Sequence, residues 1–225
     1  MDMFLENFAN LDSLLMIYPL LLQGLKLTFL LSIVTLPLAL LAGLLLAILY
    51  SFDIRALRGA VLVYIDICRS FPVVVLLVLI YFGLPSVGWQ ISGFNAAVLA
   101  MVLNHSGYFG EIFRTGVKSI PKGQYEAARA LGFRPLRLAV MIVLPQAIRN
   151  VFAPLAGNSL ELVKTTSIAA MVALPELLRS ARVAQEQTYN PTPLMAAAVI
   201  FFVLLWPFAA LALAGFSLLA AVLYH

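Results

Sequence analysis

Long stretches of this chain contain no acidic or basic residue, and this absence constrains the fold more than any single motif. Residues 27–52 carry no Asp, Glu, Lys or Arg, and residues 70–110 carry none either. About 20 consecutive apolar residues in a helix cross the hydrocarbon core of a bilayer. Hydrophobic residues make up 63% of the chain and charged residues 11%, which excludes an ordinary soluble domain. We therefore expect an all-α, polytopic membrane protein.

About five membrane-spanning helices fit the pattern, at residues 27–52, 62–83, 94–113, 146–173 and 194–219. The turn at residues 83–88 separates the second span from the third, and Glu161 and Lys164 interrupt the fourth. No internal repeat, low-complexity tract or long linker divides the chain. We therefore expect a single transmembrane domain over residues 1–225, with a prominent polar loop at about residues 114–145.

Basic residues collect in two of the connections between these spans. The first contains Arg55 and Arg58, and the loop at residues 114–145 contains Arg114, Lys118, Lys122, Arg129, Arg134 and Arg137. Lys and Arg are enriched in the cytoplasmic loops of membrane proteins. This distribution predicts a cytoplasmic polar loop, an N-terminus outside and a C-terminus inside. The net charge of +4 then reflects membrane orientation, and we expect no nucleic-acid partner.

The sequence of the polar loop predicts a helix, a tight bend and a second helix. Residues 124–131 are good helix formers, and Gly132 suits the left-handed position just past a helix end. Pro135 suits the first turn of the next helix. On the first helix, Tyr125, Ala128 and Leu131 share one face. A polar, alanine-rich surface element in an apolar chain indicates a binding site for another protein.

The motif G-Q-Y-E-A-A-R-A-L-G at residues 123–132, followed by I-V-L-P at 142–145, resembles the E-A-A-x-x-x-G coupling loop of ABC-transporter permease subunits. The motifs I-P-K-G-Q at 120–124, L-P-Q-A at 144–147 and K-T-T-S at 164–167 are similar to the polar amino-acid uptake branch. The resemblance implies an importer subunit in the bacterial inner membrane. It also assigns ATPase coupling to Gln124, Glu126, Ala127, Ala128, Arg129 and Gly132.

The same resemblance implies a set of partners. These are two ABC ATPase subunits inside, a second permease subunit that is identical or a sister chain, and an extracytoplasmic solute-binding protein. The chain has no G-x-x-x-x-G-K-[ST] phosphate loop, so we expect ATP and Mg²⁺ on the partner ATPase. We expect no catalytic residue, metal site or cofactor on this chain, whose other neighbour is membrane lipid.

Polar residues within predicted spans are candidates for a path for a polar amino acid, because such residues usually face a cavity or a partner. They are Asn104, His105, Tyr108, Glu161, Lys164, Thr166 and Ser167. A packing role for His105 and a structural ion pair between Glu161 and Lys164 are the alternatives. Relatives commonly show L-N-S-G-A-Y at the first site, from which His105 and Gly107 depart. Residues 69–72 read R-S-F-P where relatives usually have R-G-T-P. We expect this segment to kink its helix and to contribute to gating.

Two other function classes stay open at this point. An ion-gradient-driven secondary transporter or channel subunit would use Glu161 and Lys164 as coupling groups. A membrane scaffold that docks an ATPase without transporting anything would also account for the polar loop. Co-purification of an ATPase separates the first of these from the importer.

Overall fold

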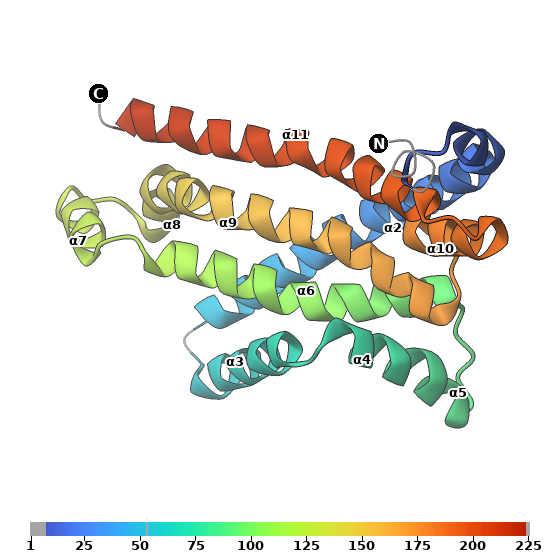
Figure 1. The fold of residues 1–225 in the computed structure, drawn as a ribbon. Coiled ribbons are helices and arrows are strands. Elements are labelled where there is room, and N and C mark those ends of the chain that lie inside the picture. Colours follow the sequence, from blue (N-terminus) through green and yellow to red (C-terminus); the bar gives the residue numbers. More distant parts are fainter. Residues whose placement is uncertain (1–7, 53, 224–225) are drawn as a thin grey trace. The chain divides into compact units, whose positions relative to one another are not determined.

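A computed structural model describes residues 8–52 and 54–223, and this part of the chain contains helices and no strand (Figure 1). Side chains are described for these residues except Leu136 and those beyond Ala210. The helices are α2 (Leu11–Ser51), α3 (Arg55–Ser70), α4 (Val73–Val78), η1 (Leu79–Gly83), α5 (Leu84–Ser86), α6 (Gly93–Lys118), α7 (Lys122–Ala130), α8 (Pro135–Leu138), η2 (Ala139–Val143), α9 (Leu144–Thr165), η3 (Thr166–Val172), α10 (Leu177–Thr188) and α11 (Thr192–Leu223). The predicted all-α fold class is confirmed.

Three stretches of the described residues are helical, long and apolar enough to cross a membrane: Leu11–Ser51, Ala139–Val172 and Thr192–Ala210. The pair Arg55–Ser70 and Val73–Ser86 makes a fourth if it is counted as one broken span. Helix α6 has 26 residues, but Asn104, His105 and Ser106 make its middle more polar. Counted with α6, these helices match the five predicted spans in order along the chain.

Helix α2 begins 16 residues before the start predicted for the first span, at Leu11 rather than Leu27. The prediction began after Lys26 because a charge is costly in lipid. The helix continues through this position because Lys26 is exposed and the segment before it is itself apolar. At 1.5 Å per residue, the 41 residues of α2 extend over about 60 Å, roughly twice the thickness of a bilayer core.

Two short π-helical turns precede prolines at the same spacing. Turn η1 ends two residues before Pro85, and turn η2 ends two residues before Pro145. A proline ring inside a helix clashes with the carbonyl four residues earlier and removes one hydrogen bond. A wider turn relieves that clash, so both helices continue past their prolines with a local widening.

The chain divides into two compact units, each of which combines segments that are far apart in the sequence. Unit 1 contains residues 1–38, 71–103 and 160–208, and unit 2 contains residues 39–70, 104–159 and 209–225. The prediction of a single domain over residues 1–225 stays a prediction.

Unit 1 has a core in which small side chains allow helices to approach closely. Leu31 of α2 packs with Leu77 and Ile80, which belong to α4 and η1. Three alanines of α6 and two residues of η3 complete this core: Ala96, Ala97, Ala100, Ala169 and Val172. All of these side chains are buried, and the alanines of α6 are completely so.

In unit 1, a second hydrophobic core and a set of hydrogen bonds join α10 to the first half of α2. Glu176 is buried just before α10, and its carboxylate accepts hydrogen bonds from the amides of Leu178 and Arg179 at 2.8 and 2.7 Å. Burial raises the pKa of this carboxyl, whereas the two amides act in the opposite direction. The Leu177 amide donates to Thr28 Oγ1 at 3.1 Å. Side chains and backbone together therefore satisfy the start of α10.

Close packing also shapes unit 2, where α6 meets the second half of α2. A Cβ atom at Gly43 would lie 2.5 Å from Phe109 Cβ and 2.8 Å from the Gly110 amide nitrogen. No side chain other than hydrogen fits there without moving the backbone of α6. Glycine at this position therefore sets the distance between the two helices.

Gly24 provides a test of close packing in unit 1. A Cβ at Gly24 would lie 2.9 Å from both the Glu176 carbonyl oxygen and Leu177 Cα, and backbone atoms cannot move aside cheaply. We predict that Gly24→Ala lowers the stability of the detergent-solubilised chain by about 1–3 kcal/mol, the usual cost of overpacking. Thermal unfolding measures this effect.

Gly59 is the matched control, because no atom lies within 4 Å of a Cβ built at this position of α3. Gly59→Ala should leave the unfolding temperature unchanged or raise it slightly, since alanine is the better helix former. Equal effects of the two substitutions would contradict the packing described for Gly24.

Candidate functional site

The loop that connects α6 to α9 begins at a point fixed to α9. The Ser119 hydroxyl donates to the Gly116 carbonyl at 2.7 Å and accepts a hydrogen bond from Asn150 Nδ2 at 2.7 Å. Pro121 is extended, with φ −58° and ψ 140°, and its carbonyl accepts the first helical hydrogen bond of α7. Helix α7 therefore starts in a defined direction beyond the end of α6 (Figure 1).

The bend after α7 has the hydrogen bonds of a Schellman motif. The Phe133 amide donates to the Ala128 carbonyl at 3.1 Å, and the Gly132 amide donates to the Arg129 carbonyl at 2.9 Å. Gly132 has a φ of +76°, as the sequence predicted. Helix α8 then begins at Pro135, also as predicted. Side chains with a Cβ resist this φ, so glycine is needed at the bend.

A small apolar core holds the loop together. Its buried members are Ile120, Ala128, Leu138 and Val143, and Tyr125 and Phe133 pack against them. A nine-residue helix alone would be marginal in water, so this core is what keeps α7 folded. Because Val143 belongs to η2, α7 is attached through this core to the start of the following long helix.

The residues predicted for ATPase coupling divide into two groups. Gln124, Glu126, Ala127 and Arg129 are exposed on α7, whereas Ala128 is only 1% exposed and lies in the core of the loop. Leu131 was predicted to share the face of Ala128, yet it is 77% exposed, because the Schellman motif ends the helix before it. Leu131 was not among the residues predicted for coupling. Its exposure therefore adds one large apolar side chain to the described surface of the loop.

The polar residues of α6 contact the end of α3, where Pro72 breaks the helix. The Cys68 carbonyl would normally accept from the amide of residue 72, which proline lacks. Asn104 Nδ2 donates to this carbonyl at 2.8 Å instead. The Tyr108 hydroxyl donates to the next carbonyl, that of Arg69, at 3.3 Å. The predicted kink at residues 69–72 is thus present, and side chains of α6 satisfy the carbonyls that it exposes.

Two further features hold α3 and α6 together along this seam, and a third residue, His105, packs within α6. The hydroxyls of Tyr64 and Ser106 lie 2.9 Å apart and share a hydrogen bond. A Cβ at Gly107 would lie 3.0 Å from Cys68 Cβ, so glycine here allows the close approach. His105 is buried, and its ring centroid lies 6.1 Å from that of Tyr108 and 6.3 Å from that of Phe109. His105 therefore lies among aromatic side chains of its own helix.

The second set of predicted substrate-path residues lies in unit 1. Glu161 Oε2 and Lys164 Nζ form an ion pair at 2.5 Å, and both side chains are more than half exposed. Thr166 is buried and donates to the Val163 carbonyl at 2.7 Å, while Ser167 donates to the Lys164 carbonyl at 2.9 Å. The first set, on α6, belongs to unit 2.

The chemistry of the described residues gives no indication of a metal centre. No group of three or more His, Cys, Asp or Glu side chains in the part of the chain that the structure describes is arranged to hold a metal ion. The main feature of these residues is instead a folded, polar helical bend that is attached to long apolar helices.

The described residues are helical, several of their helices are long and apolar enough to cross a membrane, and they include one folded polar loop, which is the architecture of a polytopic membrane protein. Residues 39–221 match the family described as the binding-protein-dependent transport system inner membrane component, and the chain belongs to this family. It is thus a permease subunit of an ABC importer, and its family name specifies dependence on a binding protein.

Individual relatives agree with this assignment. The probable amino-acid ABC transporter permease protein YckA of Bacillus subtilis is 36% identical over 74% of each chain. The arginine transport system permease protein ArtQ of the same organism is 35% identical over 83% of this chain and 86% of the relative. A crystal structure of an amino acid ABC transporter with histidines has a TM-score of 0.85 and 32% identity, covering 91% of this chain and 96% of the other.

The seam between α3 and α6 yields a prediction about stability. Asn104→Leu removes the donor to the Cys68 carbonyl and should cost about 1 kcal/mol, the usual worth of one such hydrogen bond. The effect should be smaller in a Pro72→Ala background, where residue 72 regains an amide. Thermal unfolding of the purified variants measures both effects.

Asn95→Leu is the matched control, because Asn95 lies on the same helix with an exposed side chain. An equal loss of stability at positions 95 and 104 would contradict the role assigned to Asn104.

Proposed function

We propose that this chain is the permease subunit of an ATP-driven importer that carries a polar amino acid, or a close derivative, across the bacterial inner membrane. The observation that carries this proposal is the folded bend of α7 and α8, which presents a polar helix on a core of its own. Relatives whose printed names specify amino acids and arginine support the substrate class.

The proposed partners are those that membership of this importer family implies. ATP and Mg²⁺ bind to two ATPase subunits on the cytoplasmic side, because this sequence contains no phosphate-binding loop. A solute-binding protein delivers the substrate from outside. A second permease subunit, identical or a sister chain, completes the assembly. The C-terminus is cytoplasmic and the N-terminus outside, because basic residues collect around α7 and at the start of α3.

Coupling in this proposal depends on the rigidity of the loop. ATP binding closes the ATPase subunits and draws the α7 helices of the two permeases together. The exposed residues Gln124, Glu126, Ala127 and Arg129 contact the ATPase, while Ala128 and Gly132 keep the loop in shape. The shared core with η2 carries the movement into α9. The transport cavity then changes from inward-facing to outward-facing.

The proposed substrate path follows the polar residues of two helical regions. On α6 these are Asn104, His105 and Tyr108, of which Asn104 and Tyr108 also hold the end of α3. On α9 and η3 they are Glu161, Lys164, Thr166 and Ser167. The exposed ion pair of Glu161 and Lys164 supports this role, since a carboxylate and an ammonium group together match the two charges of an amino acid.

A substitution at the bend tests coupling directly. Gly132→Val places a β-branched residue at a φ of +76°, at a cost of roughly 1–2 kcal/mol, and should distort the bend. We expect at least a tenfold loss of ATP-dependent uptake by the reconstituted transporter, with normal insertion of the permease into the membrane. Uptake in proteoliposomes and retention of the ATPase on an affinity-tagged permease are the two measurements.

Gly123→Val makes the same chemical change in the first turn of α7, where no atom lies within 4 Å of the new Cβ. This control should keep most of the uptake. Normal uptake by Gly132→Val would contradict the proposed role of the bend.

A further inference from the structure

Two contacts join the end of α6 to α9 in unit 2, and on α6 they are about one helical turn apart. At the first, the nearest atom to a Cβ built at Gly116 is Val151 Cγ1, and the Ala147 carbonyl oxygen is 3.6 Å away. At the second, Asn150 Nδ2 donates to Ser119 Oγ at 2.7 Å. Gly116, Ala147 and Val151 are buried, so the two helices are in direct contact here. We call Gly116, Ser119, Asn150 and Val151 the α6–α9 clamp.

Val151 has little freedom to move away from position 116. The preceding helical turn holds a β-branched side chain to one strongly preferred rotamer. A methyl group at position 116 would overlap Val151 Cγ1, and it would therefore push α9 away from α6. The hydrogen of Gly116 thus sets the distance between the two helices at this point.

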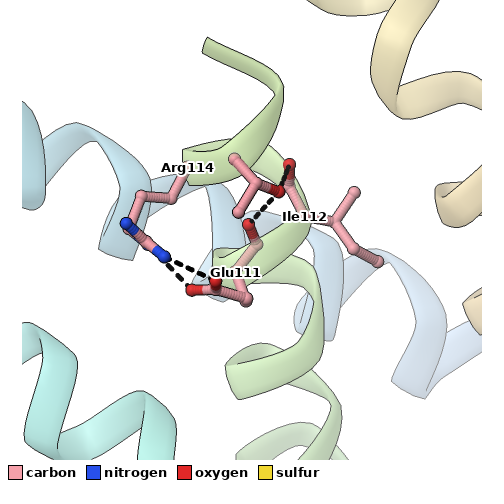
Figure 2. A network of polar contacts seen from close by, with 4 residues as sticks. Glu111, Ile112 and Arg114 are labelled. Carbon is pink, nitrogen blue, oxygen red and sulfur yellow. Dashed lines mark hydrogen bonds and ion pairs between the residues drawn. The ribbon is translucent and has the colours of Figure 1, made fainter. Parts of the chain in front are cut away.

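Side chains of α6 support the helix just before the clamp. Arg114 donates to both carboxylate oxygens of Glu111, at 2.8 and 2.5 Å, and Figure 2 shows this fork-like pairing. The Thr115 hydroxyl donates to the Glu111 carbonyl at 2.7 Å. An ion pair between residues three apart stabilises a helix. The last turns of α6 therefore keep their helical shape, and a force applied beyond them acts on the helix as a whole.

The loop that contains α7 begins directly after the clamp. Ile120 follows Ser119 and is buried in the core of the loop with Ala128. At its other end, the loop connects to α9 through the π-helical turn η2 and Pro145. A π-helical turn and a proline both interrupt the regular hydrogen bonds of a helix. The clamp is therefore the more regular of the two connections between the loop and the long helices.

We propose that Gly116, Ser119 and Asn150 are positioning residues for energy coupling. They hold the base of the loop on α9, so that a displacement of α7 moves α6 and α9 together. This inference rests on the proposed function of the chain as the permease of an ATP-driven importer. The three residues act through α7 and do not contact the ATPase. A loosened clamp leaves the ATPase bound and active, but less of its movement reaches the long helices.

The test measures the number of substrate molecules imported per ATP hydrolysed, in proteoliposomes that contain the ATPase subunits and the solute-binding protein. The probes are radiolabelled arginine and glutamine. A variant that only folds or assembles less well lowers uptake and hydrolysis in proportion, so its ratio stays unchanged. For Gly116→Ala and Asn150→Leu we expect a ratio at least about twofold lower, the low end of what single substitutions do to coupling between sites. Retention of the ATPase on an affinity-tagged permease should stay normal.

A compensating substitution makes the test specific for the contact between the helices. Val151→Ala removes Cγ1, and the Cβ of residue 151 lies 3.5 Å from a Cβ at position 116, an ordinary van der Waals distance. The double variant Gly116→Ala/Val151→Ala should therefore recover most of the wild-type ratio. A wild-type ratio in Gly116→Ala, or no recovery in the double variant, would overturn the proposal. If Gly116→Ala does not assemble, Asn150→Leu decides in the same way.

Ser51→Ala is the matched control for Ser119→Ala. The Ser51 hydroxyl donates to the Ile48 carbonyl at 2.6 Å, as the Ser119 hydroxyl donates to the Gly116 carbonyl at 2.7 Å. Asn150 donates to Ser119, so we expect a lower ratio for Ser119→Ala and the wild-type ratio for Ser51→Ala. Equal ratios for these two variants would contradict the role of the clamp. Failure of the wild type to import either probe with ATP would instead refute the proposed function itself.

Discussion

The structure depends on one constraint: a backbone carbonyl or amide that loses its helical partner in apolar surroundings must find another. Helix α3 meets this constraint at Pro72, where Asn104 and Tyr108 of α6 donate to the carbonyls of Cys68 and Arg69. Polar residues in the middle of α6 are therefore needed for the helix break itself. The same constraint accounts for the buried Glu176, whose carboxylate accepts from the first amides of α10.

The loop between α6 and α9 satisfies this constraint through local geometry. Its Schellman motif pairs the last carbonyls of α7 with the amides of Gly132 and Phe133, and Phe133 packs onto the same core as Ala128. No distant partner is needed to shape the bend. A loop with a core of its own can transmit a push or pull from a partner without unfolding, as the proposed coupling to an ATPase requires.

Local features of the fold could be predicted from sequence because glycine and proline determine the backbone conformation at their own positions. Gly132 predicted the bend, Pro135 the start of α8 and Pro72 the break after α3. The partners of polar residues could not be predicted in the same way, because they depend on packing between helices. Asn104 was polar in an apolar stretch, and sequence alone could not show that its amide donates to Cys68. Leu131 was assigned to the wrong face because helical spacing does not apply beyond the point where a Schellman motif ends the helix.

The energy source of transport is the central claim, and one measurement addresses it directly. The chain is reconstituted into proteoliposomes with its ATPase and solute-binding protein, and uptake of radiolabelled polar amino acids is recorded. We predict uptake only when ATP is present on the side that α7 faces, with no uptake driven by a proton or sodium gradient alone. Gradient-driven uptake without ATP would contradict the account and would instead support the Glu161–Lys164 pair as coupling groups of a secondary transporter.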